Sequence, residues 1–457
     1  MVFQAASSTV DYDRIIALIE ERLTLVPRYR QRVMEVPGRL ANPLWVDDPA
    51  FDVTYHVRQA ALPRPGSDRQ LEEFVTRISP RPLDRNRPLW EAYIVEGMEN
   101  GRFAIVTKTH PALVDGAAAL DLAHVILTED PGAGPEAAGA EPVAWRPRRL
   151  PNTMSLVTEA VGEMVRRPMQ VVETLQSGVH DVAATGGRVL AAVGEVASTL
   201  LQASARPAPS LPLNGPVGSA RRFVMVGTDL ADYRDVRSRL MKGRRPEEVT
   251  VNDVILATLA GALRTWLLTR GEAVTNTTTV RALVPVSVHT GDDDERGHHL
   301  SAFFVDLPVG EPNPRMRLHQ IAYAMHQQTD AGRAVGARSL SGLAGFAPPT
   351  MHSLGARIAR MASRRLYNLA VTNVPGPQRP RYALGARLLA TYPVLPLSPD
   401  QALAIGLTSY DGGVYYGLHA DRDTVPDVDV LGRAIVDALA ELREAPRLAR
   451  SRGTIEP

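Results

Sequence analysis

Two stretches of strand-like and helix-like hydrophobic patterns run through the chain, one on each side of a long central segment. Period-two alternation or short hydrophobic runs predict strands, and hydrophobic positions three or four residues apart predict helices. The pattern predicts strands at 1–4, 42–46, 51–57, 92–96, 102–109, 221–229, 279–287, 300–309, 402–409 and 414–420, and one more within 366–377. It predicts helices at 11–32, 70–78, 232–241, 250–268 and 315–334, and a last amphipathic helix within 421–442. This mixture is typical of an α/β fold.

Segments rich in proline and glycine separate the two stretches. Residues 129–151 are predicted to be a flexible linker, and residues 206–216 form a second joint. Between them, residues 154–205 carry hydrophobic positions at helical spacing, which favours a helix packed across two lobes over a helix on a membrane surface. We therefore expect three parts: an N-terminal lobe over 1–150, a helical crossover and linker over 151–215, and a C-terminal lobe over 216–457.

The composition is that of an ordinary globular protein. The chain has 457 residues, 44% hydrophobic and 22% charged, and this length predicts two or more domains or one large two-lobed fold. Its net charge of +1 argues against a nucleic-acid partner. The absence of cysteine excludes disulfides, cysteine-ligated zinc and a cysteine nucleophile. Because we find no leader pattern and no run of about 18 apolar residues, we expect a cytoplasmic protein with at most peripheral membrane contact.

An acidic loop at 290–299 raises the question of a metal site. It holds four acidic residues and two histidines, His298 and His299. Their spacing fits neither a calcium-binding EF-hand loop nor a zinc-protease helix. We therefore predict a solvated loop and no bound metal.

A predicted strand that ends in a histidine is the candidate centre of chemistry. The run 102–109 leads into His110 and Pro111, and Asp115 and Gly116 follow before another hydrophobic run. Histidine is the side chain best suited to proton transfer near neutral pH. A nearby aspartate can orient an imidazole or brace the turn, and glycine lets the backbone bend there.

This stretch resembles the HHxxxDG signature of coenzyme A-dependent acyltransferases, and its pattern is most similar to the bacterial wax ester synthase/diacylglycerol acyltransferase family. The resemblance extends from about residue 11 to residue 442 through motifs in the same order: Pro-Leu-Trp at 88–90, the histidine motif at 110–116, Asn-Asp at 252–253 and Asn-Val-Pro-Gly-Pro at 373–377. It implies two chloramphenicol-acetyltransferase-like α/β lobes, with mixed sheets flanked by helices and a tunnel between the lobes. It also implies acyl-CoA as a substrate and no further cofactor.

The motif departs from the family at the residue that the chemistry needs most. In the family, the second histidine takes the proton from the acceptor alcohol, and here Pro111 occupies its place. Proline has no ionisable group, so it cannot act as a base. His110 is then the candidate for a displaced base, although neighbouring side chains of a strand face opposite ways and a bulge would be needed. Alternatively, His110 is a packed residue behind the site. The resemblance gives Asp115 a structural, orienting role beside Gly116.

The other motifs supply candidate substrate-channel residues. Trp90 is expected to fill the core of the first lobe, with ligand contact as the alternative. Asn252 and Asp253 are expected to pin a helix beside the channel. Asn373, Pro375 and Gly376 form a turn that either lines the channel or has only a structural role. Outside the motifs, His56 is predicted to lie at an exposed or edge position.

Three functions remain open at this point. The leading one is an acyl-CoA-dependent O-acyltransferase that makes triacylglycerol from diacylglycerol, or wax esters from long-chain alcohols, with activity impaired by the missing base. The second is a catalytically silent paralogue that binds acyl lipids, lipid droplets or an active relative. The third is a peptide-synthetase condensation domain, which the Pro-Leu-Trp and Asn-Val-Pro-Gly-Pro pair disfavours. Family members also usually carry a further N-terminal strand and helix, so we expect a shortened first lobe or a misplaced start.

Overall fold

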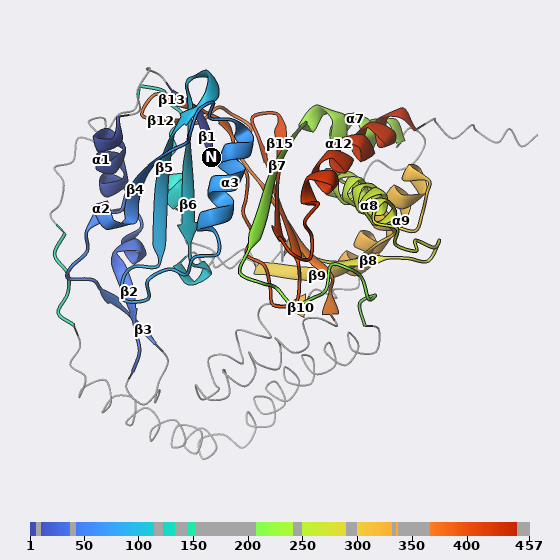
Figure 1. Ribbon diagram of the computed structural model, residues 1–457, viewed down its shortest axis with the longest axis horizontal. Helices are drawn as coiled ribbons and strands as arrows, with labels where there is room; N and C mark the ends of the chain where they lie inside the picture. Colours follow the sequence, from blue (N-terminus) through green and yellow to red (C-terminus); the bar gives the residue numbers. More distant parts are fainter. Residues whose placement is uncertain are drawn as a thin grey trace, which may run out of the picture.

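The protein is an α/β structure of two lobes, each built on a mixed sheet (Figure 1). The computed structural model describes residues 1–5, 11–36, 43–113, 122–132, 145–150, 207–240, 249–288, 299–330, 335–336 and 366–445. The predicted helical crossover at 154–205, Asp115 and Gly116, and the acidic loop at 290–298 lie outside these residues.

The sheet of the first lobe has the strand order β12-β13-β1-β6-β5-β4. Its strands are β1 (Val2–Gln4), β4 (Val57–Ala61), β5 (Trp90–Met98), β6 (Arg102–Thr109), β12 (Tyr382–Ala383) and β13 (Ala386–Ala390). All neighbours are antiparallel except β4 and β5. A tight turn joins β5 to β6, where Asn100 and Gly101 both have positive φ angles, a conformation that asparagine and glycine tolerate.

The helices of the first lobe are α1 (Tyr12–Arg22), α2 (Val53–His56), α3 (Asp68–Ile78) and α4 (Leu122–Val125). The helix predicted at 11–32 is too long, because α1 ends ten residues earlier. A short 3-10 turn starts at Pro27, and β2 (Gln31–Met34) then pairs with β3 (Leu44–Asp47). Proline is accepted at the start of such a turn, where its missing N–H has no partner to lose.

The strand predicted at 51–57 is wrong over most of its length. The Asp52 side chain accepts a hydrogen bond of 2.9 Å from the backbone N–H of Thr54, and this cap starts the single turn of α2. His56 was predicted to be exposed, and this too is wrong: it is 1% exposed. Its ring stacks on Trp90 with a centroid distance of 4.6 Å, so His56 packs in the core through an aromatic contact.

The sheet of the second lobe has the order β10-β9-β8-β11-β14-β15-β7, and its three central strands run parallel. The strands are β7 (Arg221–Asp229), β8 (Val280–Val288), β9 (His299–Leu307), β10 (Val335–Gly336), β11 (Leu369–Pro375), β14 (Leu403–Tyr410) and β15 (Gly413–Asp421). The strands predicted at 402–409 and 414–420 are confirmed as β14 and β15, and they pair as an antiparallel hairpin.

Four helices cover one side of this sheet, namely α7 (Leu230–Leu240), α8 (Val251–Thr269), α9 (Pro314–Asp330) and α12 (Val428–Glu444) (Figure 1). The main hydrophobic core lies between them and the strands. Among the described residues, α8 is long and apolar enough to cross a membrane, but 72% of it is buried inside the protein. We therefore assign it to the core of the lobe.

The two lobes are joined by more than one connection. Strands β12 and β13 belong to the C-terminal half of the sequence but complete the first sheet. Helix α3 of the first lobe packs against β7 of the second, and Figure 1 shows it between the two sheets. A carboxylate oxygen of Glu72 in α3 accepts a 2.7 Å hydrogen bond from the backbone N–H of Met225 in β7. The predicted domain limits stay a prediction, and β12 and β13 show that the lobes interleave.

Candidate active site

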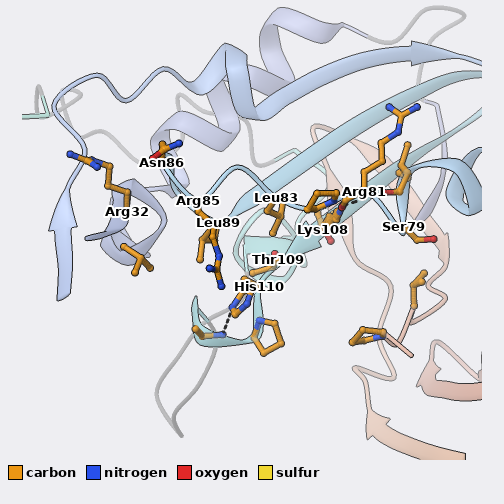
Figure 2. A pocket seen from close by; sticks show the side chains of 18 of the residues that line it. Arg32, Ser79, Arg81, Leu83, Arg85, Asn86, Leu89, Lys108, Thr109 and His110 are labelled. Atoms are coloured by element: carbon orange, nitrogen blue, oxygen red, sulfur yellow. Dashed lines mark hydrogen bonds between the residues drawn. The ribbon is translucent and has the colours of Figure 1, made fainter. Parts of the chain in front are cut away.

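A cavity of 930 Å³ lies where the end of β6 meets the end of α3 (Figure 2). Most of its lining comes from the first lobe, while Val394, Pro396 and His419 come from the second. The cavity therefore opens on the boundary between the lobes, a common position for a ligand site. His110 and Pro111 both line it.

His110 is exposed to the cavity, so it is not the packed residue that one prediction described. It follows the last residue of β6 without a bulge there, and its backbone N–H donates a 3.0 Å hydrogen bond to the carbonyl of Leu89. The ring Nδ1 accepts a 3.1 Å hydrogen bond from the backbone N–H of Ala112. In a neutral ring with this bond, the proton sits on Nε2, and the cavity side of His110 is a donor.

Pro111 opens a short 3-10 turn, Pro111–Leu113, directly after His110. Proline suits the first position of such a turn, because its φ angle is already near the helical value. The residue that replaces the motif histidine therefore shapes the backbone at the cavity and offers it no titratable group. The roles predicted for Asp115 and Gly116 concern residues outside the described part of the chain.

Trp90 fills the core of the first lobe, as predicted. It is 1% exposed, and its Nε1 donates a 2.8 Å hydrogen bond to the carbonyl of Tyr29. The Nδ1 of His56 donates a 2.8 Å bond to the Trp90 carbonyl, and burial lowers the pKa of His56, which stays neutral. Trp90 does not line the cavity, but its neighbour Leu89 does and also holds His110. The Pro-Leu-Trp motif therefore positions His110 through Leu89, while Trp90 packs in the core next to it.

Basic side chains surround an otherwise largely apolar cavity. Arg32, Arg81, Arg85 and Lys108 lie on its lining, together with the acid Glu35. Figure 2 shows the Arg85 side chain extending toward His110. Arginine stays charged in proteins and presents several N–H donors, so this lining suits a phosphorylated or otherwise anionic ligand.

Lys108 fixes the end of α3 against β6. Its ammonium group donates to the carbonyl of Ile78 at 3.1 Å and to the carbonyl of Arg81. Burial lowers the pKa of Lys108. The side chain is thus already engaged, and it sets the distance between the end of β6 and the end of α3.

Sequence reasoning missed a serine and a histidine that meet at the cavity. The hydroxyl oxygen of Ser79, at the end of α3, lies 3.3 Å from Nε2 of His419 in β15. The other ring nitrogen of His419 lies 2.5 Å from the carbonyl oxygen of Leu395. His419 is 3% exposed, and this burial lowers its pKa to about 4. The two residues are 340 positions apart, so no local pattern could have paired them.

The predicted residues of the second lobe come together, but away from this cavity. The side-chain amide of Asn373 donates a 3.0 Å hydrogen bond to the side-chain oxygen of Asn252. Asp253 is buried in a capping box with Thr250, and burial raises the pKa of Asp253. Among the described residues that line the cavity, neither asparagine appears. Their place in a substrate channel stays a prediction.

The Pro-Gly turn after β11 is held from the neighbouring strand. The backbone N–H of Gly376 donates a 2.9 Å hydrogen bond to the carbonyl of Ser409. A methyl group added at Gly376 would lie 2.4 Å from that oxygen, so the strands approach too closely for any other residue. Pro375 is exposed beside it. The contacts of Gly376 support the structural role, and neither residue lines the described cavity.

Comparison with known families gives a match along most of the chain. The model of the wax ester synthase/diacylglycerol acyltransferase catalytic domain matches residues 1–255, and the model of the C-terminal domain of the same family matches residues 296–443. A probable diacylglycerol O-acyltransferase of Mycobacterium tuberculosis is 31% identical over 451 residues, which cover 97% of this chain and 91% of that protein. Another from the same organism is 42% identical over 241 residues, 52% of this chain and 87% of that protein.

Solved structures share the arrangement of the two lobes. A wax ester synthase/diacylglycerol acyltransferase from Marinobacter aquaeolei is 28% identical, with a TM-score of 0.63 over 96% of this chain and 92% of that chain. A starter condensation domain of rhizomide synthetase, solved with C8-CoA, has a TM-score of 0.52 at 14% identity and covers 98% of this chain and 89% of that chain. The second likeness concerns the fold alone.

Proposed function

Because this chain belongs to the wax ester synthase/diacylglycerol acyltransferase family and is an acyltransferase, we propose that it moves a fatty acyl group from acyl-CoA to the free hydroxyl of diacylglycerol. Its mycobacterial relatives carry the name diacylglycerol O-acyltransferase. A long-chain alcohol is the second acceptor, since the family also includes wax ester synthases. The reaction needs no cofactor beyond the acyl-CoA substrate.

The observation that carries this proposal is the cavity at the lobe boundary. Its apolar walls suit an acyl chain, and Arg32, Arg81 and Arg85 suit the phosphates of coenzyme A. His110 lies at the same cavity and, with its proton on Nε2, can donate a hydrogen bond to an oxygen that gains negative charge during transfer. The cavity thus combines an apolar space, positive charge and a donor.

A catalytically silent binding role is the less favoured alternative, because the matching family model is that of the catalytic domain. The absent motif histidine nevertheless requires another group to take the proton of the attacking hydroxyl. Diacylglycerol resides in lipid, so we propose that the protein meets this substrate at a membrane or lipid-droplet surface.

The test supplies the purified chain with radiolabelled palmitoyl-CoA and with vesicles that contain dioleoylglycerol or hexadecanol. We expect labelled triacylglycerol with the first acceptor, together with release of an equal amount of free thiol. Thiol release without any labelled ester, or no release with either acceptor, overturns the proposal. Labelled wax ester with hexadecanol alone would shift the acceptor to long-chain alcohols.

A charge-reversed pair of variants ties the activity to the cavity. Arg85→Glu removes a cation from the lining, and we expect about a tenfold rise or more in KM for palmitoyl-CoA, since one charge-assisted contact is worth about 1.5–3 kcal/mol. Arg69→Glu is the matched control, because Arg69 is exposed on α3 and pairs with Glu73 away from the cavity. Equal effects of the two variants would contradict this site for coenzyme A.

A further inference from the structure

We propose that Ser79 and His419 form a nucleophile–base pair that receives the acyl group, so that transfer proceeds through an acyl-serine intermediate. This inference rests on the proposed acyltransferase function and names how that reaction proceeds without the motif histidine. It assigns the chemistry to side chains from both lobes, α3 in the first and β15 in the second.

The hydrogen bonds around His419 point in the direction that nucleophile activation requires. Nδ1 of His419 faces the carbonyl oxygen of Leu395 at 2.5 Å, and a carbonyl only accepts, so the ring proton is on Nδ1. Nε2 therefore has a free lone pair, and it faces the hydroxyl of Ser79 at 3.3 Å. A base within reach of a nucleophile and itself oriented by a third group is the arrangement that activates a serine. The Leu395 carbonyl takes the orienting place.

Ser79 and His419 differ in how far they are exposed to the cavity, and this difference suits their two roles. His419 is 3% exposed, whereas Ser79 is partly exposed, and both residues line the cavity. A substrate in the cavity thus meets the Ser79 hydroxyl first, and Figure 2 shows that hydroxyl on the side of the cavity facing the second lobe. Burial lowers the pKa of His419 to about 4, so the ring is unprotonated at neutral pH and its Nε2 lone pair is available to the Ser79 hydroxyl.

His110 has the opposite arrangement. Its Nδ1 accepts the backbone N–H of Ala112, which leaves Nε2 with the proton. The Nε2 atoms of the two cavity histidines therefore differ in role. Nε2 of His110 is a hydrogen-bond donor, and Nε2 of His419 is an acceptor for the Ser79 hydroxyl. In this arrangement His110 suits the stabilisation of an oxyanion better than the removal of a proton.

The fold holds Ser79 in place for this role. Its backbone N–H donates a 2.9 Å hydrogen bond to the carbonyl of Val75, and Lys108 holds the neighbouring carbonyl of Ile78 at 3.1 Å. The bond from Met225 to Glu72 fixes α3 on the sheet that carries His419. Each element that brings the pair together is thus tied by a named contact.

Acyl transfer through Ser79 takes two steps. In the first, the Ser79 oxygen forms a bond to the thioester carbon, the carbon–sulfur bond breaks, and the serine proton passes through Nε2 of His419 to the departing thiolate. In the second, the acceptor hydroxyl attacks the serine ester, its proton passes through Nε2, and the bond from the carbon to the Ser79 oxygen breaks as that oxygen regains a proton. The products are coenzyme A and the new ester.

The experiment looks for the intermediate directly. The full chain is mixed with palmitoyl-CoA in the absence of any acceptor, and intact mass and peptide mapping follow the protein. We expect a burst of thiol equal to the amount of protein, an added palmitoyl group on Ser79, and its loss on addition of dioleoylglycerol. Ser79→Ala should show no adduct, and His419→Gln should form it about 10²–10⁴-fold more slowly, the usual effect of losing a general base.

Further variants separate chemistry from folding. Ser79→Cys keeps a nucleophile of similar size at the end of α3 and should carry the acyl group as a thioester, which hydroxylamine releases faster than an ester. Ser238→Ala and His326→Gln are matched controls on exposed faces of α7 and α9, and both should form the adduct as the native protein does. Thermal unfolding checks that every variant is folded.

The outcomes of this experiment are distinct. Triacylglycerol synthesis without an adduct, an adduct on another residue, or full turnover in folded Ser79→Ala overturns the pair and leaves the proposed function intact. A native protein that releases no thiol with any acceptor overturns the proposed function and the pair together. A mapped adduct on Ser79 that the acceptor removes supports both.

Discussion

The side-chain amide of Asn373 donates a 3.0 Å hydrogen bond to the side-chain oxygen of Asn252 and so ties the C-terminal part of β11 to the first turn of α8. These residues come from two motifs that are 121 positions apart in the sequence. We expect Asn252→Ala and Asn373→Ala to be coupled, because a single hydrogen bond contributes about 0.5–1.5 kcal/mol. Urea unfolding of both single variants and the double variant measures the coupling energy. As a control, the effects of Asn252→Ala and Asn276→Ala on the free energy of unfolding should add, because Asn276 is exposed. Additive effects for Asn252→Ala and Asn373→Ala as well would contradict the hydrogen bond between those two residues.

Gly376→Ala should destabilise the second lobe by about 1–3 kcal/mol, the usual cost of forcing an extra carbon into a packed site. The added methyl group would lie 2.4 Å from the carbonyl oxygen of Ser409. Gly215→Ala is the control, because the nearest atom to its added methyl group is 3.8 Å away. Urea unfolding compares the two, and equal stability would show that the turn after β11 moves aside without cost.

The stability of the protein should depend on pH through Glu72, whose pKa burial raises to about 7. The unfolded chain releases this proton near pH 4.5, so between pH 4.5 and 7 the folded state holds more protons. The free energy of unfolding therefore falls as pH rises through this window and levels off above it.

Glu72→Gln should remove this dependence, roughly 1–2 kcal/mol across the window once solvent screening is allowed for. Chemical unfolding at several pH values measures the slope. Glu73→Gln serves as the control, since Glu73 is largely exposed beside Arg69. If both variants keep the slope of the native protein, the effect does not originate at Glu72.

Pro111→His should raise turnover by about tenfold or more, because a well-placed general base typically contributes about 10²–10⁴-fold. This change puts an ionisable ring at the family's position for the base, at the same cavity. The gain should persist in Pro111→His combined with Ser79→Ala, since a direct base needs no acyl-serine. Pro82→His adds a histidine elsewhere on the lining and should give no gain. Initial rates with palmitoyl-CoA and dioleoylglycerol measure all of these variants.

Sequence patterns predicted most of the longer strands and helices, but they missed the short strands β2, β10, β12 and β13. The limits predicted at 102–109 and 221–229 agree with β6 and β7, because the hydrophobic residues that mark these strands are a local signal. The helix predicted at 11–32 ran too far, since hydrophobic spacing continues through the turn at Pro27. At 51–57 the β-branched and aromatic residues favoured a strand. The hydrogen bond from the Asp52 cap starts a helical turn there instead, and the hydrophobic pattern does not register such a cap.

The residues of the candidate site could be predicted only in part from the sequence. The motif pointed to His110, and the structure places it at the cavity. The burial of His56 depends on a ring 34 positions away, and the meeting of Ser79 with His419 depends on the packing of the two lobes. Contacts of this kind are decided by tertiary structure, and one sequence without a structure does not reveal them.

The placement of β12 and β13 makes the two halves of the chain inseparable. Strand β1 pairs with β6 on one side and with β13 on the other. A fragment that stopped before residue 382 would leave the backbone of β1 as an open edge, which attracts strands from other molecules. Splitting this protein at its middle should therefore yield aggregates or strand-exchanged pairs of copies, and only the uncut polypeptide can close its own first sheet.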